Sequence, residues 1–177
     1  MIGRARSVVL TGLTGHVIEV EAHLASGLPA FTLVGLPDAS LGEARDRVRA
    51  AVASSGLTWP ARCLTVNLSP ASLPKSGSVT DLAIAVAALA AAQLISPGQA
   101  ARAVHLGELG LDGRVRPVRG VLPAVAAARA AGVSEVVVAR ADADEAALVD
   151  GVQVRAVSTL AELLACYGSD EARPIAT

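Results

Sequence analysis

The sequence is poor in the residue types that usually carry metal or redox chemistry. It has two cysteines and three histidines, and neither type forms a cluster. Cys63 and Cys166 lie far apart and lack the Cys-x-x-Cys spacing of a zinc site or a redox pair, so we interpret them as small apolar residues. His16, His23 and His105 are equally scattered. We therefore expect no metal site in this chain.

Aromatic residues and lysine are also rare. Aromatic side chains make up 2% of the chain against 53% for all hydrophobic residues, so alanine, valine and leucine must build the core. Lys75 is the only lysine among 15 basic residues, and the others are arginine. With 16 acidic residues the net charge is −1, which gives no overall basic footprint of the kind that indicates nucleic-acid binding.

Long apolar runs are missing as well. The longest, near residues 82–95, has about fourteen residues and is too short to span a bilayer. The N-terminal segment MIGRARSVVLTG has no long apolar run, so it does not indicate a signal peptide. We therefore expect a cytoplasmic protein without a membrane partner. Its 177 residues suit one domain with a sizeable core.

The sequence does contain a regular succession of strand and helix patterns. Residues 16–24 alternate apolar and polar side chains, which predicts a strand with one face in water. The short connections near the N-terminus predict an antiparallel meander of three strands, and the later alternation of helices and strands predicts a more parallel part. The fold class expected is α/β with a mixed sheet. The predicted elements are strands 4–11, 16–24 and 30–34, helix 38–55, strand 64–68, helix 79–94, strand 103–109, a hairpin turn at 112–113, helix 123–131, strand 135–139, a short helix from 142, strand 152–157 and a helix ending near 167.

Several helix starts carry capping patterns. Ser40 with Glu43 fits a capping box, with Asp38 as the other candidate cap, and Thr159 with Glu162 fits a second box. Ser78 is expected to cap the Ala-rich helix, with Asp81 in its first turn. On helix 38–55 the arginines lie away from the apolar stripe and are expected on a solvated face; these are Arg45, Arg47 and Arg49.

The loop at 69–78, between a buried strand and the Ala-rich helix, is the place where chemistry could reside. Pro74 precedes Lys75, so the loop is not the phosphate-binding loop of an ATPase. A serine–lysine pair remains an alternative, with Lys75 as the base and one of four serines as the nucleophile: Ser69, Ser72, Ser76 or Ser78. That pair needs a buried lysine of lowered pKa, whereas Lys75 in this polar loop is expected to face solvent or a partner.

Three long stretches resemble the N-terminal domain of the YifB/ComM family of magnesium-chelatase-like AAA+ ATPases. They are GLPAFTLVGLPDASLGEARDRVRAAVASSG at 27–56, LTVNLSPASLPKSGSVTDLAIA at 64–85 and LGELGLDGRVRPVRGVLPAVAAARAAGV at 106–133. The resemblance implies a two-layer α/β sandwich similar to the proteolytic domain of Lon and to a ribosomal small-subunit protein domain. It covers residues 1–167, and we interpret 168–177 as a polar linker toward an AAA+ module.

The Lon comparison also implies where a catalytic pair would lie. Lon's nucleophile motif matches residues 74–81, with Val79 at the serine position. Its lysine motif matches 117–122, with Leu122 at the lysine position. Both positions hold aliphatic side chains, so the resemblance implies a domain that is not an enzyme.

The family implies a hexameric, DNA-processing motor of the branch-migration or helicase type, linked to competence. ATP and Mg²⁺ would bind in the AAA+ module, outside this chain, and the expected partners are that module, neighbouring subunits and DNA. The residues expected to contact nucleic acid or a partner are Lys75, Arg45, Arg49, Arg114, Arg116 and Arg119. The alternatives are an atypical serine–lysine peptidase and a purely structural oligomerisation module.

Overall fold

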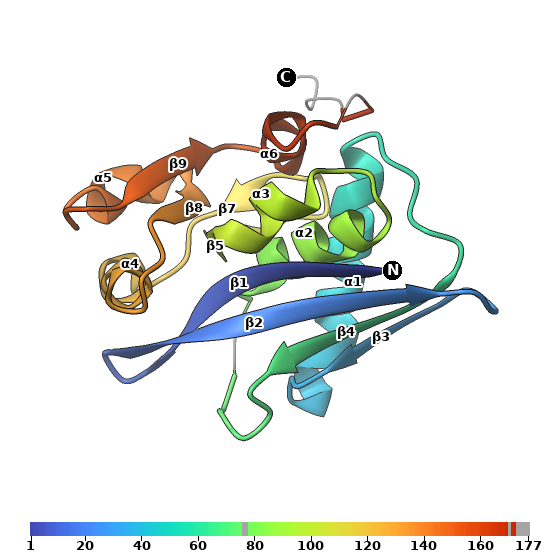
Figure 1. Ribbon diagram of the computed structural model, residues 1–177, viewed down its shortest axis with the longest axis horizontal. Helices are drawn as coiled ribbons and strands as arrows, with labels where there is room; N and C mark the ends of the chain where they lie inside the picture. The colour runs from blue at the N-terminus through green and yellow to red at the C-terminus, as the bar shows by residue number, and fades with distance from the viewer. Residues whose placement is uncertain (76–77, 170, 173–177) are drawn as a thin grey trace.

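A seven-stranded mixed sheet runs through the protein, and its N-terminal strands lie along the bottom of Figure 1 with α2 above them. The computed structural model describes residues 1–75, 78–169 and 171–172. The strand order is β3-β4-β2-β1-β5-β8-β9, and β6 and β7 form a separate hairpin. The strands are β1 (Ile2–Thr11), β2 (Thr14–Ala25), β3 (Ala30–Val34), β4 (Cys63–Ser69), β5 (Val104–Leu106), β6 (Glu108–Leu109), β7 (Val115–Arg116), β8 (Glu135–Ala139) and β9 (Gln153–Val157). The helices are α1 (Asp38–Ser54), α2 (Asp81–Ala91), α3 (Pro97–Arg102), α4 (Val121–Ala130), α5 (Ala143–Ala146) and α6 (Leu160–Cys166), with a 3-10 turn at Arg140–Asp142.

The predicted α/β class with a mixed sheet and an antiparallel N-terminal part is confirmed, but the predicted three-strand meander is wrong. β1 and β2 form an antiparallel hairpin, and β4 rather than β3 lies on the other side of β2. β3 pairs with β4 in parallel. The reason is the intervening helix α1, because a strand–helix–strand crossover joins parallel strands whereas a tight turn joins antiparallel ones.

Helix α2 is the centre of the larger core. All of its residues are buried, as its nearly continuous apolar sequence predicts. It packs against β1 and β2 and touches α1 and α3. The contact with β1 is so close that a Cβ at Gly3 would lie 2.2 Å from the carbonyl oxygen of Ala87.

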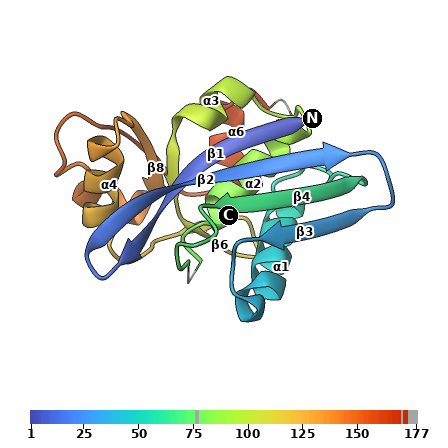
Figure 2. The same cartoon turned by 60° about the horizontal axis from the view of Figure 1, so that its bottom comes forward.

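The half of the sheet formed by β5 and β8 is covered on both faces. Val137 and Ala139 pack into the core around α2, whereas Val136 and Val138 pack with α4 in a second cluster. Helix α4 also lies against the β1–β2 hairpin near its turn, where a Cβ at Gly15 would lie 2.5 Å from the Cβ of Ala127 (Figure 2). The resemblance implies two layers, and over this half of the sheet α4 adds a further layer on the second face.

The capping predictions have mixed outcomes. Thr159 caps α6, because its hydroxyl accepts from the Glu162 amide at 3.1 Å, and the Glu162 carboxylate accepts from the Ser158 amide at 2.8 Å. Ser40 is not a cap: α1 starts two residues before it, after Pro37, and it has no side-chain cap. Ser78 does not cap α2 either, because the Glu108 carboxylate takes its hydroxyl.

No helix in the part of the chain that the structure describes is long and apolar enough to cross a membrane.

Candidate functional site

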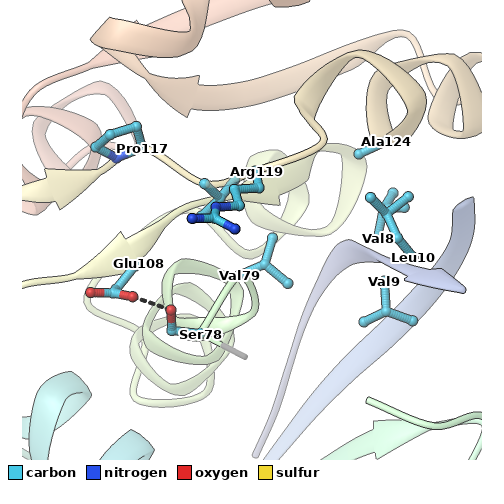
Figure 3. Close-up of a pocket in the computed structure, with 10 residues that line it drawn as sticks. Val8, Val9, Leu10, Ser78, Val79, Glu108, Pro117, Arg119 and Ala124 are labelled. Atoms are coloured by element: carbon cyan, nitrogen blue, oxygen red, sulfur yellow. Dashed lines mark hydrogen bonds between the residues drawn. The ribbon is translucent and has the colours of Figure 1, made fainter. Parts of the chain in front are cut away.

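A pocket of about 550 Å³ opens where β1 and β5 separate (Figure 3). Within the described strands, β1 and β5 share one residue pair, Arg6 with Val104, and then diverge. The pocket is lined by residues 8–10 of β1, residues 78–79 before α2, Glu108 of β6, the loop at 117–119 and Ala124 of α4. Valine and leucine side chains face a few polar groups there, which is the composition of a small-ligand or peptide pocket.

Ser78 is held at this pocket by a carboxylate. Its hydroxyl donates a hydrogen bond to Glu108 (Figure 3). A serine nucleophile needs a neighbouring base that takes its proton at neutral pH, usually histidine or a lysine of lowered pKa. The Glu108 carboxylate is a much weaker base, so this contact orients Ser78 without activating it.

Lys75 is buried, so the expectation that it faces solvent is wrong. Its side chain is 3% exposed. The ammonium donates to the carbonyl oxygens of Pro70 and of Leu73, the latter at 2.9 Å. Burial lowers the pKa of Lys75. These backbone carbonyl oxygens take the place of the water molecules that would solvate an exposed lysine. The sequence pattern of the loop does not reveal this contact.

The lysine nevertheless does not form a catalytic pair with the described serines. None of Ser69, Ser72 and Ser78 is hydrogen-bonded to its amine in the described part of the chain, and Ser76 lies outside the described residues. Two carbonyl oxygens hold the ammonium in place. Both acceptors belong to the loop that carries Lys75.

The positions matched to the Lon pair both lack a reactive group. Val79 is half-buried and lines the pocket. Leu122 is the second residue of α4 and is 39% exposed. Its backbone amide donates a hydrogen bond to the Glu145 carboxylate at 2.9 Å. Neither alkyl side chain can attack a carbonyl or accept a proton.

The structure contains an ion pair between Arg47 and Asp81 that the sequence did not predict. Asp81 is 1% exposed and accepts two hydrogen bonds from Arg47, at 2.7 and 3.1 Å, and a third from the Leu109 amide at 3.1 Å. The Arg47 side chain is only 22% exposed, so it does not lie on a solvated face as expected, and its hydrogen bond to Asp81 raises the pKa of Arg47. Burial raises the pKa of Asp81, opposed by Arg47 and by the Leu109 amide. One feature of the sequence could have indicated this pair. Asp81 is a single carboxylate at the start of an otherwise apolar helix, and a buried carboxylate needs a cationic partner.

The predicted contact arginines lie in two places. Arg119 lines the pocket, and Arg116 of β7 pairs across from Glu108 of β6. Arg114 forms an exposed ion pair with Asp112 at 3.2 Å. The other two are on α1: Arg45 is half-buried, and Arg49 covers the ring of Phe31, with 5.8 Å from its guanidinium carbon to the ring centre. Of the five arginines, Arg119 lines the pocket together with Glu108, and Arg116 lies opposite Glu108 in the β6–β7 register.

Comparison with known proteins gives the family. The family model for subunit ChlI of Mg-chelatase matches residues 20–142. The chain belongs to the ChlI family. An uncharacterised protein of Mycobacterium tuberculosis strain H37Rv is 56% identical to it over 162 residues, 92% of this chain and 32% of that protein.

Two further relatives confirm the resemblance to YifB and ComM. Competence protein ComM of Haemophilus influenzae is 39% identical over 166 residues, 94% of this chain and 32% of ComM. The YifB protein of Escherichia coli K12 is 41% identical over 140 residues, 79% of this chain and 28% of YifB. This ChlI-family chain thus spans about a third of the length of these relatives.

A more distant likeness connects this ChlI-family chain with a protease. Lon protease of Mycolicibacterium smegmatis is 29% identical over 176 residues, 92% of this chain and 22% of Lon. The likeness agrees with the α/β fold. Within the described residues, no group of three or more His, Cys, Asp and Glu side chains is placed to hold a metal ion.

Proposed function

We propose that this chain is a non-catalytic, Lon-like accessory domain of a longer AAA+ ATPase. The observation that carries the proposal is Val79, an alkyl side chain at the pocket where the Lon comparison expects the nucleophile. Ser78 next to it is bound to Glu108, and the Lys75 amine is occupied by backbone carbonyls. The pocket therefore has the form of a binding site but contains no activated nucleophile.

The longer protein would process DNA. Support comes from the relative named competence protein ComM, of which this chain matches about a third. ATP and Mg²⁺ would bind in the remainder of such a protein, which would work in the cytoplasm as a ring of identical subunits. In that setting the domain would position the motor or contact DNA through the exposed arginines, of which Arg119 lines the pocket and Arg116 precedes it by three residues.

The absence of catalysis is tested with a fluorophosphonate serine probe and a fluorescently labelled casein. We expect neither a covalent adduct nor hydrolysis by the 177-residue chain. Ser78→Ala and Lys75→Met variants serve as matched controls for any residual signal. An adduct that disappears in either variant would contradict the proposal and favour the serine–lysine peptidase.

The DNA contact is tested by fluorescence anisotropy with labelled single-stranded and forked DNA at 50 and 200 mM salt. We expect binding that weakens with salt, because phosphate contacts by arginine release counterions. Arg116→Gln/Arg119→Gln should weaken it about tenfold. Arg62→Gln/Arg129→Gln removes the same charge elsewhere and should leave it nearly unchanged. Equal loss in both double variants, or no binding at 50 mM salt, would refute the contact.

A further inference from the structure

A second pocket, of about 630 Å³, lies between the end of α3 and the beginnings of β8 and β9. Its polar lining consists of Gln99 and Arg102 from α3, Glu135 from β8, Gln153 and Arg155 from β9, and Tyr167 after α6. None of these residues lines the pocket around Val79. The second pocket is therefore separate from the site on which the proposed function rests.

Strand register brings the β8 and β9 side chains to one face. Glu135 pairs with Gln153, and Val137 pairs with Arg155. Side chains two residues apart on a strand share a face, so Gln153 and Arg155 lie on the face where Val137 joins the core around α2. Tyr167 belongs to the same core. The Arg155 guanidinium carbon lies 6.0 Å from the centre of the Tyr167 ring.

Tyr167 forms the floor of the second pocket, and its side chain is fixed in place and uncharged. Tyr167 is 3% exposed, and its hydroxyl lies 2.9 Å from Nε2 of His105, which is fully buried. Desolvation lowers the pKa of His105 to about 4, so the imidazole is neutral at pH 7. Its Nδ1 faces the Arg6 carbonyl oxygen at 3.4 Å and so carries the proton, which leaves Nε2 to accept from the Tyr167 hydroxyl. The Tyr167 carbonyl in turn accepts from the Ser96 amide at 2.8 Å, which ties the floor to the start of α3.

Two arginines converge on this floor without a carboxylate partner. The charges of Arg155 and Arg102 both act on Tyr167 and lower its pKa, against the larger raising effect of burial. Within the described residues, Arg102 and Arg155 have no carboxylate within 4.0 Å, although Glu135 lines the same pocket. Two guanidinium groups that share a hollow repel each other unless an anion lies between them, and their planar donor arrays match the oxygens of a phosphate.

The remaining lining groups suit more than a bare phosphate. Gln99 and Gln153 each carry a donor and an acceptor, and Glu135 accepts hydrogen bonds from hydroxyl or amino groups. The apolar part of the lining on this face comes from Ala103 and Val137. The volume lies within the usual range for small-ligand pockets. We propose that this pocket binds a nucleotide unit, with its phosphate on Arg102 and Arg155 and its sugar or base on Gln99, Gln153 and Glu135.

The test uses the 177-residue chain and three probes at 50 mM salt. AMP and inorganic phosphate are titrated by calorimetry, and a fluorescein-labelled 12-nucleotide DNA strand is followed by anisotropy. The test variant is Arg102→Gln/Arg155→Gln, in which both changed side chains are exposed. Arg62→Gln/Arg129→Gln, with the same loss of charge, and Arg116→Gln/Arg119→Gln, at the other pocket, are the controls. Thermal unfolding checks that every variant folds.

We expect AMP or the DNA strand to bind the wild-type chain, and the Arg102/Arg155 variant to bind at least about tenfold more weakly, as for the loss of a charge-assisted contact. The Arg62/Arg129 control should stay within about twofold. Binding of AMP assigns the pocket to a free nucleotide, whereas binding of the strand alone assigns it to a unit within single-stranded nucleic acid. Binding of inorganic phosphate only, binding of none of the probes, or equal loss in the test variant and the Arg62/Arg129 control would overturn the inference. Loss in the Arg116/Arg119 variant alone would support the contact of the proposed function and refute this one.

Discussion

Removal of Arg47 should destabilise this protein far more than removal of any neighbouring arginine. The Asp81 carboxylate is 1% exposed and accepts hydrogen bonds from Arg47 at 2.7 and 3.1 Å and from the Leu109 amide at 3.1 Å. Arg47→Ala leaves a buried carboxylate with a single amide donor. Breaking a buried ion pair in this way costs about 3–5 kcal/mol. With a urea dependence of about 2 kcal/mol/M, the unfolding midpoint should fall by roughly 1.5–2.5 M.

The pH dependence of this loss provides a second check. Burial raises the pKa of Asp81, and the two contributions of Arg47 oppose that rise. Without Arg47 the folded-state pKa must rise further above the unfolded value of about 3.9. A carboxyl whose pKa is raised on folding holds its proton more tightly in the folded state, so its contribution to stability is lost as pH rises. The deficit of Arg47→Ala relative to wild type should therefore be largest at pH 7 and shrink towards pH 4.

The matched control lies two residues along the same helix. Arg49→Ala removes an equal side chain that covers the Phe31 ring at 5.8 Å, a contact worth about 0.5–1 kcal/mol. Arg47→Met/Asp81→Leu removes both charges and should recover a large part of the loss, because no buried charge remains unpaired. Similar losses in Arg47→Ala and Arg49→Ala at pH 7, or a deficit that does not change with pH, would refute the role of the buried pair.

Two further predictions concern the core. His105 is fully buried with a pKa of about 4, against about 6.5 when unfolded, so unfolding takes up a proton between these values and stability should fall by about 3 kcal/mol as pH drops from 6.5 to 4. Urea unfolding at pH 7 and pH 5 should show a smaller change in His105→Gln than in wild type, and an equal change would contradict the assignment. Gly42 lies within α1 with nothing within 4 Å of an added Cβ, so Gly42→Ala should stabilise by about 0.5–1 kcal/mol and raise Tm by about 2–3 °C. Gly3→Ala, whose Cβ would lie 2.2 Å from the Ala87 carbonyl oxygen, should instead lower Tm sharply, and the opposite order of the two glycine variants would show that the β1–α2 contact is looser than described.

Local patterns in the sequence predicted most elements, because these have a clear period or a clear turn. Helix α3 was not predicted, and the predicted strand 103–109 is divided between β5 and β6, which belong to different sheets. Strand 135–139 was predicted with the observed bounds, and the Asp112–Gly113 turn does join β6 to β7. The position of β3 was not predicted, because strand order depends on which edge the α1 crossover reaches. That choice is made by packing between residues far apart in the sequence, and no local pattern records it.

The family resemblance singled out Val79, which lies at the pocket. The partners that hold Ser78 and Lys75, and the Asp81 partner of Arg47, were not predicted. Each of these side chains takes its partner from a different element or from a folded loop: Glu108 of β6 for Ser78, the Pro70 and Leu73 carbonyls for Lys75, and Asp81 of α2 for Arg47. A polar residue in a short loop or on a helix gives no sign in sequence of whether water or the protein will satisfy it.

The buried helix α2 requires the turn before it, whatever side chain stands at position 79. A helix that starts inside a core must satisfy its first backbone donors within the protein. Here the Leu82 amide donates to the Gly107 carbonyl at 3.2 Å, and the Gly107 amide donates to the Val79 carbonyl at 3.2 Å. The Asp81 carboxylate also accepts a hydrogen bond from the Leu109 amide, at 3.1 Å. Residue 79 contributes only its backbone to this network, so any side chain that tolerates the half-buried position preserves the turn. Stability thus retains the shape of the site while placing no demand on a nucleophile at Val79 or a base at Leu122.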